Sequence, residues 1–487
     1  MKDVKEFFKL KKNLFIENIM TDSRNKLDNS IFFCVIGLTV NGHDFIEKAI
    51  ENGAIAIVHS QKVKRSIVKS NKDIVFIKVD DTLKCLNSFA DYYYDYPSHN
   101  MKVYGVTGTN GKTSISYITN YLLNELNTKC GYIGTLGYEY GGVLRDTYFT
   151  TPNINELHKI LSEMRDVDCK AVALEISSQG LDLHRSDSVD VDVACFTNLT
   201  HEHLDYHKDF EGYFNAKARL FENLKKDAIA CINIDDEYGR KMVDKCHCKV
   251  VTFGIDNDAD YKANNLVLYD DHSEFDLVFD GKTFLIYTNL IAKFNISNLL
   301  AIIASLIETG YKIGDIIPLL KTIKSVPGRC MHIDEGQDFN VIVDYAHTPD
   351  GFNKILDYAQ ECTGENGKLL IVFGSRGSGD VEKRFAFGKI TDERCDEIFI
   401  TTEDNHYEDI ELILNDIEST ITNHKAHRIA SRKQAIIEAI KLCKKGDVLL
   451  ILGKGTENYF KTGDNIEIYE GDDKVARQAL KSISSNK

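Results

Sequence analysis

One segment of the sequence combines the residue types that bind a phosphate group. It reads Gly105-Val-Thr-Gly-Thr-Asn-Gly-Lys-Thr113, follows a predicted strand and leads into a helical pattern over residues 114–126. Its glycines let successive backbone N–H groups turn towards a phosphate, and the positive end of the helix dipole adds to this attraction. Lys112 supplies a mobile charge and Thr113 a hydroxyl for Mg²⁺, although the loop departs from a strict Walker A spacing. The segment predicts a nucleotide site and leaves kinases and simple ATPases open.

Two segments with acids or histidines follow later strands. Glu175 comes directly after the apolar run 171–174, which predicts a carboxylate at the carboxyl end of a strand, where ligands of open α/β sheets gather. A carboxylate there can hold a metal beside the phosphates. Residues 201–207 contain three histidines and two acids, but their spacing is neither that of H-E-x-x-H nor that of a Cys-His finger, which disfavours zinc. We predict one imidazole on Mg²⁺ and a structural role for the others.

A lysine and a second acid complete the candidate groups. Lys217 interrupts a helical pattern that includes Phe214 and Phe221, a position usual for a lysine that extends to the surface. Asp344 again ends an apolar strand, in the string Asp344-Tyr-Ala-His-Thr-Pro349, and Arg329 stands just upstream. The function therefore has to be inferred from the combination of these segments.

Composition sets the class of protein that carries these groups. The chain has 487 residues, 43% of them hydrophobic and 27% charged, which predicts a globular protein of about three domains. No apolar run approaches a membrane span and the start lacks the pattern of a signal peptide, so we expect a cytoplasmic protein without a membrane partner. The net charge of −15 disfavours nucleic acid. The twelve cysteines, including Cys246 and Cys248, are predicted to be reduced structural thiols, because no second ligand cluster at zinc spacing follows.

Strand and helix patterns alternate along the whole chain, which predicts an α/β fold. Apolar runs at 31–36, 54–58 and 74–79 form a first unit, which ends where a tyrosine-rich helix reaches Pro97. Strands of the buried type then alternate with helices up to a turn at Pro327-Gly328, which predicts a mostly parallel sheet covered on both faces. Four more strands, at 341–344, 369–373, 397–401 and 448–452, predict a third, doubly wound unit.

Taken together, the motifs resemble one family over nearly the whole chain, the ATP-dependent Mur ligases, and within it the MurE-type enzymes that add the third residue of the cell-wall peptide. The matching strings are Asp22-Ser-Arg24, Gly42-His-Asp-Phe45, GTNGKT (108–113), Thr150-Thr-Pro152, EISSQG (175–180) with Arg185, FTNLTHEHLDYH (196–207), YFNAKARLF (213–221), FNISN (294–298), VPGR (326–329), VDYAHTP (343–349) and GKGTE (453–457). The resemblance implies three domains: a UDP-substrate domain over 1–97, a central ATP-binding domain over 98–326 and a Rossmann-like, amino-acid-binding domain over 327–487.

The resemblance also implies a role for individual residues. For ATP these are Gly108, Thr109, Asn110, Gly111, Lys112, Thr113, Ser114, Asn295, Arg329 and Asp344. For the UDP-linked acyl substrate they are Ser23, Leu38, Thr39, Val40, Thr150, Thr151, Ser177 and Arg185. For the incoming amino acid they are Asp404, Asn405, Tyr407, Gly453 and Glu457. Catalysis is implied for Lys112, Glu175, His203 and Lys217, and Mg²⁺ ligation for Thr113, Glu175, His203 and a carbamylated Lys217.

The reaction implied by the resemblance joins two small molecules at the expense of ATP. ATP phosphorylates the carboxylate of a UDP-N-acetylmuramoyl dipeptide to an acyl phosphate, the amine of an amino acid attacks, and phosphate leaves. The expected cofactors are ATP and Mg²⁺, and we expect the protein to be a monomer. Closure of the domains should exclude water, because an acyl phosphate hydrolyses readily.

The C-terminal part departs from the family at the amino-acid pocket. The family loop G-x-x-G-D-R-D-x-x-K-R reads Gly374-Ser-Arg-Gly-Ser-Gly-Asp-Val-Glu-Lys-Arg384 here, so Gly379 takes the place of the arginine and Arg376 is displaced. The family signature D-N-P-R is Asp404-Asn-His-Tyr407, and GKGHE has become GKGTE. Since an arginine that binds a carboxylate with two hydrogen bonds has no equivalent in glycine or tyrosine, we predict that meso-diaminopimelate is not the substrate. Lysine and an unusual amino acid stay open.

Two other functions remain alternatives. One is a Mur-like ligase of specialised metabolism that acts on a non-muramoyl carboxylate, such as a folate, although folate-type relatives lack the N-terminal motifs present here. The other is a binding or regulatory protein that retains the phosphate loop and forms no bond. Release of ADP that depends on both joining partners would exclude the second.

Overall fold

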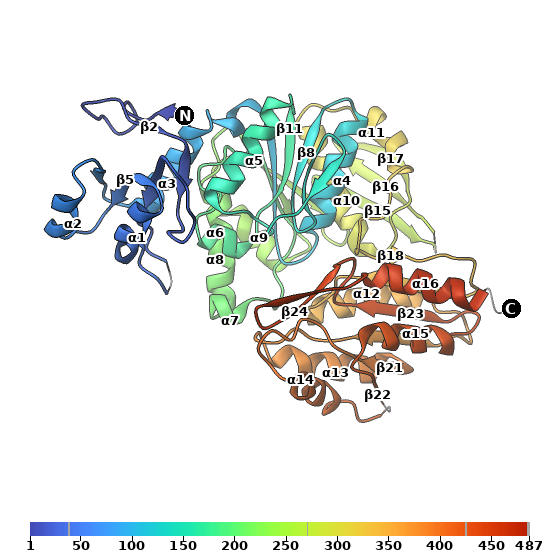
Figure 1. Ribbon diagram of the computed structural model, residues 1–487. Coiled ribbons are helices and arrows are strands. Elements are labelled where there is room, and N and C mark those ends of the chain that lie inside the picture. Colours follow the sequence, from blue (N-terminus) through green and yellow to red (C-terminus); the bar gives the residue numbers. More distant parts are fainter. Residues whose placement is uncertain (38, 270, 424–425, 485–487) are drawn as a thin grey trace.

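The computed structural model describes the chain except residues 38, 270, 424–425 and 485–487, and within the described residues three sheets of four, eleven and six strands organise the molecule (Figure 1). Two further pairs of strands, β1 with β2 and β24 with β25, lie outside these sheets. The α/β class expected from the sequence is confirmed. Among the described residues, no helix is both long enough and apolar enough to cross a membrane.

The first sheet is parallel, with strands in the order β3-β4-β5-β6. Two apolar clusters pack on its two faces, one of them beneath α3, whose N-terminus Asp81 caps by accepting from the N–H groups of Leu83 and Lys84. Helix α3 ends at Tyr93, three residues before the end expected from the sequence. The elements of this part are β1 (Lys2–Asp3), β2 (Phe15–Ile16), β3 (Asn18–Met20), β4 (Ser30–Phe33), η1 (Gly42–Phe45), α1 (Ile46–Glu51), β5 (Ala54–His59), α2 (Arg65–Ser70), β6 (Val75–Lys78), α3 (Thr82–Tyr93) and η2 (Pro97–Asn100).

The second sheet has the strand order β10-β9-β8-β11-β7-β12-β13-β14-β15-β16-β17. Its centre is parallel, as expected, whereas β9–β10 and β15–β17 extend it with antiparallel strands that the sequence reasoning did not predict. The strands are β7 (Lys102–Thr107), β8 (Cys130–Gly134), β9 (Gly137–Tyr140), β10 (Val143–Arg145), β11 (Ala171–Glu175), β12 (Val193–Phe196), β13 (Ile229–Asn233), β14 (Lys249–Gly254), β15 (Tyr261–Leu268), β16 (Ser273–Phe279) and β17 (Lys282–Thr288).

Helices cover both faces of the parallel centre of this sheet. One face packs on α4 and the apolar α10, which begins five residues before the helix expected at 298–308, and the other face packs on α5 and α8. The helices are α4 (Lys112–Glu125), α5 (Ile154–Asp166), α6 (Ser178–Asp182), α7 (Leu204–His207), α8 (Phe210–Glu222), α9 (Glu237–Val243), α10 (Lys293–Glu308) and α11 (Ile313–Leu320).

Strand register in this sheet brings the chemical groups together. Strand β7, which leads into the phosphate loop, pairs with β11 on one side and with β12 on the other, in both cases in parallel. The register places Glu175 opposite Val106, and Phe196 opposite Thr107. Because parallel strands end at the same edge of a sheet, the loops after β7, β11 and β12 meet there.

The third sheet, in the order β18-β19-β23-β20-β21-β22, is parallel apart from β18. Apolar clusters fill the space between the sheet and helices on both faces, so this part is doubly wound as expected. Its elements are β18 (Met331–His332), β19 (Asn340–Asp344), α12 (Pro349–Cys362), β20 (Leu369–Phe373), α13 (Glu382–Arg394), β21 (Glu397–Ile400), α14 (Ile410–Glu418), β22 (Ala426–Arg428), α15 (Arg432–Leu442), β23 (Val448–Leu452), β24 (Tyr459–Thr462), β25 (Asn465–Ile468) and α16 (Asp472–Ser484).

Candidate active site

The phosphate loop between β7 and α4 requires glycine at two positions. Gly108 has a φ of 149°, and a Cβ there would lie 1.8 Å from Oγ1 of Thr197. Gly111 has a φ of 92°, and a Cβ there would lie 2.5 Å from Oδ1 of Asn298. Both the backbone conformation and the lack of space exclude other residues. The loop therefore presents its backbone at the start of α4, as the sequence predicted.

Lys112 lies partly buried at the end of this loop. Its Nζ donates to the carbonyl oxygens of Gly108, at 3.0 Å, and of Thr109, at 2.8 Å. Burial lowers the pKa of Lys112, while the carboxylates of Glu202 and Glu175 act in the opposite direction. The ammonium group thus lies where a phosphate would contact the loop. The two neighbouring carboxylates would repel that phosphate.

Glu175 is fully buried at the end of β11 and accepts four hydrogen bonds. Oε2 accepts from the hydroxyls of Thr113, at 3.0 Å, and Thr135, at 3.1 Å; Oε1 accepts from Tyr132, at 2.6 Å, and from the N–H of Thr135, at 3.0 Å. These donors fix the carboxylate beside the first turn of α4. Glu175 is therefore shielded from solvent, and Ser177, not Glu175, caps the helix α6 that follows.

The residues predicted to hold the acyl substrate form one continuous group beside Glu175. Thr150 shares a hydrogen bond of 3.2 Å with the hydroxyl of Thr135, which itself bonds Glu175. Thr151 accepts from the N–H of Ser177, at 2.9 Å, and Arg185 donates to the carbonyl of Thr151, at 3.0 Å. A substrate bound by these residues would lie next to Glu175 and the phosphate loop.

The histidines of residues 201–207 serve separate contacts. His207 shares a hydrogen bond of 3.0 Å with Ser178 and stacks on Tyr213, which gives it a structural role. His203 lies 3.7 Å from Glu202, and burial lowers its pKa, which keeps the imidazole neutral and able to bind a metal. Among the described residues, no three or more His, Cys, Asp or Glu side chains form a group that could hold a metal ion without other ligands.

Lys217 points inward from α8 and is 1% exposed, so the surface role usual for a lysine does not apply here. Its Nζ donates to the carbonyl of Gly108, at 2.8 Å, and lies 4.5 Å from the centre of the Tyr213 ring. Burial and the neighbouring charge of Lys112 lower its pKa well below the ordinary value. The side chain is therefore a buried amine in contact with the phosphate loop, and its lowered pKa favours the neutral form.

The C-terminal part contributes two further predicted residues to the cavity at the phosphate loop, and one of them, Arg329, contacts Thr113 directly. Arg329 donates to the hydroxyl of Thr113, at 3.1 Å. Asp344, at the end of β19, accepts from the N–H groups of Cys330 and Ala346, both at 2.6 Å, and burial raises its pKa. Asn295 is buried on α10 and donates to the carbonyl of Ile291, at 2.9 Å.

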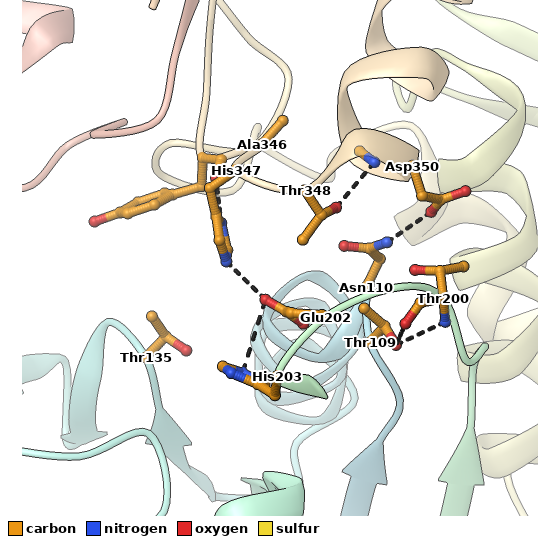
Figure 2. Close-up of polar contacts among 12 residues, drawn as sticks. Thr109, Asn110, Thr135, Thr200, Glu202, His203, Ala346, His347, Thr348 and Asp350 are labelled. Atoms are coloured by element: carbon orange, nitrogen blue, oxygen red, sulfur yellow. Dashed lines mark hydrogen bonds and ion pairs between the residues drawn. The ribbon is translucent and has the colours of Figure 1, made fainter. Parts of the chain in front are cut away.

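Two side-chain bridges cross from the central part to the C-terminal part beside these residues (Figure 2). The amide of Asn110 donates to Asp350, at 2.8 Å, at the start of α12. Oε1 of Glu202 lies 2.8 Å from Nε2 of His347. A third pair, His201 with Asp380, spans 3.1 Å.

A cavity of about 860 Å³ lies between the two parts at this edge. Its lining includes four of the predicted ATP-binding residues of the loop and helix α4, together with Arg329 and Asp344. The other side of the cavity is lined by residues of β13, β14 and α12 that the sequence did not assign. Its size and its loop of backbone N–H groups suit a nucleoside triphosphate.

The residues predicted for the incoming amino acid follow strands β21 and β23, at the carboxyl edge of the C-terminal sheet. The buried Lys454 donates to Asp404, at 2.9 Å, and to Glu457, at 2.6 Å. The amide of Asn405 donates to the carbonyl of Glu408, at 2.8 Å, and its oxygen accepts from a hydroxyl of the β24–β25 hairpin. Gly453 has a φ of 109°, and the exposed Tyr407 bonds Asp464 in the turn of the β24–β25 hairpin.

The residues predicted for the UDP end lie in the N-terminal part. Ser23 is buried, and its carbonyl accepts from Asn52 at 2.6 Å. Thr39 and Val40 are exposed in the loop after β4, where Gly37 donates to the carbonyl of Val40 at 2.8 Å. Leu38 lies outside the described residues. Of the described residues, Ser23, Thr39 and Val40 do not line the cavity at the phosphate loop. The role of all four residues stays a prediction.

Three family models match successive segments of the chain. They are "Mur ligase family, catalytic domain" over 15–94, "Mur ligase middle domain" over 106–306 and "Mur ligase, glutamate ligase domain" over 328–455. A UDP-N-acetylmuramoyl-L-alanyl-D-glutamate--2,6-diaminopimelate ligase of Clostridium acetobutylicum is 36% identical over 473 residues, covering 97% of this chain and 96% of the relative. The chain belongs to the Mur ligase family.

Other comparisons agree with this assignment. A UDP-N-acetylmuramyl-tripeptide synthetase of Oceanobacillus iheyensis is 35% identical, covering 91% of this chain and 90% of the relative. A solved structure described as a UDP-N-acetylmuramoyl-L-alanyl-D-glutamate--2,6-diaminopimelate ligase is 25% identical, covers 99% of both chains and superposes with a TM-score of 0.70. As a Mur ligase, the protein is an ATP-dependent enzyme that acts on small molecules.

Several residues of this Mur ligase site escaped the sequence reasoning. Tyr132 and Thr135 hold Glu175, and neither belongs to a motif that the sequence made conspicuous. His347 and Asp350 carry the bridges to the central part, and His347 stands in the VDYAHTP string. Their partners are more than 140 positions away in the chain, so the pairing is a property of the fold.

Proposed function

We propose that this Mur ligase joins an amino acid to the free carboxylate of UDP-N-acetylmuramoyl-L-alanyl-D-glutamate through an acyl phosphate, in the synthesis of peptidoglycan precursors. The names of the relatives support the acyl substrate. The observation that carries the proposal is the row of hydrogen bonds from Thr113 through Glu175 and Thr135 to Thr150, which joins the nucleotide loop to the predicted acyl site. A carboxylate held at Thr150 would face the γ-phosphate of ATP at the loop.

The chain's own residues would then lower the barrier by charge and position. Lys112 and Arg329 would offset the negative charge that builds on the transferred phosphoryl group. Thr151, Ser177 and Arg185 would orient the acyl substrate. Because the C-terminal part covers the cavity, it would exclude water from the acyl phosphate until an amine attacks.

The residues beside the loop fit Mg²⁺. Mg²⁺ prefers oxygen ligands and usually combines one or two protein oxygens with phosphate oxygens and water. Thr113 and Glu175 offer a hydroxyl and a carboxylate whose oxygens are 3.0 Å apart, and the neutral His203 lies at the same edge of the sheet. We propose that these residues hold Mg²⁺, which would withdraw charge from the phosphates.

Lys217 is proposed to carry a carbamate, as the family resemblance implies. A neutral amine attacks CO₂ to give a carbamate and release a proton, and the lowered pKa of Lys217 keeps its amine neutral. The resulting carboxylate would stand next to Gly108, where it would add a negative oxygen ligand near the metal. The burial of the side chain supports a role inside the site.

The incoming amino acid is proposed to have one carboxylate. The relatives named above include diaminopimelate ligases, but this chain has Tyr407 where the D-N-P-R signature has arginine, and the hydroxyl of Tyr407 bonds Asp464. A phenol cannot replace a guanidinium for a distal carboxylate. We therefore retain the prediction that meso-diaminopimelate is not preferred.

The proposal includes the organisation of the chain. We propose domains over 1–97, 98–326 and 327–487, and each of the three sheets falls within one of these ranges. We also propose that the enzyme acts as a monomer and, because it consumes ATP and a UDP-linked precursor, in the cytoplasm.

The test is the release of ADP with UDP-N-acetylmuramoyl-L-alanyl-D-glutamate and a panel of amino acids, with product mass measured. The expected result is ADP release that requires both partners, in equal amount to a conjugate heavier by the amino acid minus water. ATP consumption that is independent of the partners, without a heavier product, would overturn the proposal. A conjugate formed only with another carboxylate, such as a folate, would favour the alternative of specialised metabolism.

A further inference from the structure

The segment 404–407 adopts a backbone that the family signature could not adopt. His406, which stands at the proline of D-N-P-R, has a φ of 49°, and its N–H donates to the carbonyl of Lys461 at 3.1 Å. Proline holds φ near −65° and has no N–H, so it can do neither. His406 also forms a β-bridge with Thr462. The segment is therefore tied to the β24–β25 hairpin, and the contacts of the family signature do not transfer residue by residue.

This tie brings two cations to one place. Nε of Arg376 donates to Nε2 of His406 at 2.7 Å, and Lys461 is the hairpin residue whose carbonyl accepts from the N–H of this histidine. Burial and the charges of Arg376 and Lys461 lower the pKa of His406 and outweigh the opposite effect of Asp404 and Glu403, so the ring accepts from Arg376 without forming an ion pair with it. Within the described residues, neither Arg376 nor Lys461 forms an ion pair with a carboxylate at 4.0 Å or less.

Acids for an ammonium group stand next to these cations, around the ring of Tyr459. Nζ of Lys461 lies 5.4 Å from the centre of this ring and Nζ of Lys454 4.8 Å from it. Lys454 holds Asp404 and Glu457 on its side of the ring. An amino acid is a zwitterion, and this arrangement offers carboxylates for its ammonium groups and free cations for its carboxylate.

A tyrosine of the central part completes the arrangement. Tyr148 is 76% exposed, and Nζ of Lys461 lies 5.5 Å from the centre of its ring. The next residue, Phe149, packs under the guanidinium of Arg185 at 4.1 Å, and Thr150 and Thr151 follow. The short loop before Thr150 thus contacts both the predicted acyl site and the hairpin.

We infer that Lys461, together with Arg376, binds the carboxylate of the incoming amino acid, and that Tyr148 covers this carboxylate from the central part. The inference rests on the proposed function and names the residues that select its second substrate. Lys461 lies outside the motifs by which the family was identified. Lys461 lies on another element than the arginine that this chain lacks, and it takes over the role of that arginine. It supplies a cation for one carboxylate, and Tyr407 offers no cation to bind a second.

The binding role has a consequence that a structural role lacks. Removing a cation that binds a carboxylate weakens the binding only of substrates that have this carboxylate. L-lysine and 1,5-diaminopentane differ by this group alone, as do L-ornithine and 1,4-diaminobutane. The loss on removing Lys461 should therefore be confined to the amino acid and spare the diamine.

The experiment compares Lys461→Ala, Lys461→Arg and Tyr148→Ala with the unaltered enzyme, using the better substrate of L-lysine and L-ornithine, and the corresponding diamine. Lys389→Ala, an exposed lysine on α13 in the same part of the chain, is the matched control. For Lys461→Ala we expect kcat/KM for the amino acid to fall about 10- to 100-fold, the loss of one charge-assisted hydrogen bond. The KM for ATP and kcat/KM for the diamine should not change, Lys461→Arg should restore most of the loss, and Tyr148→Ala should raise the KM for the amino acid.

The outcomes separate the two proposals. An active enzyme whose Lys461→Ala variant keeps its KM for the amino acid, or loses amino acid and diamine alike, would overturn the inference and leave the proposed function intact. An unaltered enzyme that forms no conjugate with any amino acid of the panel would overturn both. An unchanged KM for ATP shows that each variant is folded.

Discussion

The bridge between Glu202 and His347 should control closure of the C-terminal part over ATP. Oε1 of Glu202 lies 2.8 Å from Nε2 of His347 and 3.7 Å from Nε2 of His203 (Figure 2). Glu202 is 11% exposed, whereas His347 is 44% exposed. A hydrogen bond to a charged group contributes about 1.5–3 kcal/mol, and water around His347 screens part of it, so we expect about 1–2 kcal/mol. This corresponds to a factor of about 5–30 in the closed-to-open ratio.

A double-mutant cycle isolates this contribution. Glu202 also lies near Lys112 and His203, so Glu202→Gln alone changes more than the bridge, and only the coupling with His347→Ala reports the pair. The coupling is measured in KM for ATP and in the radius of gyration by small-angle scattering without nucleotide. The matched control is the pair His427 and Glu397, 3.1 Å apart within the C-terminal sheet, which should change thermal stability without changing either readout. A coupling within about 0.3 kcal/mol of zero at Glu202 and His347 would refute the reasoning.

The bridge also predicts a direction with pH. Burial alone would lower the pKa of His347, but the hydrogen bond and charge of Glu202 outweigh it and raise the pKa above the ordinary 6.5. Burial raises the pKa of Glu202, but His347, His203 and Lys112 together bring it below the ordinary 4.5. The contribution to closure is therefore fully present between pH 4.5 and 6.5 and is lost as the pH rises through the raised pKa of His347. In Glu202→Gln this pH dependence should disappear.

Three further predictions address the rest of the site. Lys217→Ala should abolish turnover, and acetate or formate should partly restore it if the carbamate supplies a needed carboxylate; full activity without additives would remove Lys217 from the mechanism. Gly111→Ala should weaken ATP binding measured by calorimetry by more than tenfold and lower the free energy of unfolding by more than about 1 kcal/mol, because its Cβ meets Asn298 and its φ is positive; unchanged ATP binding would contradict the account of the loop. In an amino-acid panel, meso-diaminopimelate should be a poorer substrate than L-lysine, and clear preference for it would refute the argument from Tyr407.

Much of the site could be predicted because its residues are close to strand ends. Glu175 and Asp344 each end an apolar run, and parallel strands gather ligands at their carboxyl ends. This rule places Glu175 at the edge that carries the phosphate loop, and Asp344 at an edge of the C-terminal sheet that lines the same cavity as the loop. The burial of Lys217 was different. Its helical pattern favoured a surface residue, and only the resemblance to a family placed it inside, because the loop it contacts is 109 positions away.

The features that the sequence did not reveal depend on contacts between distant segments or on backbone torsion. The antiparallel strands β15–β17 were not predicted, although the residues of β16 alternate between buried and less buried positions, a signal that a period-two search could have found. The bridge from Glu202 to His347 joins residues 145 positions apart. The positive φ of His406 follows from its bond to the hairpin, which no local pattern encodes.

The most direct test of the central claim follows an oxygen atom. The acyl substrate is labelled with ¹⁸O in its free carboxylate, and the inorganic phosphate released during conjugate formation is examined by mass spectrometry. If ATP activates this carboxylate as an acyl phosphate, each phosphate released should carry one ¹⁸O atom from the substrate, and the amide product should retain the other. Phosphate without the label, formed at the same rate as the conjugate, would contradict the account.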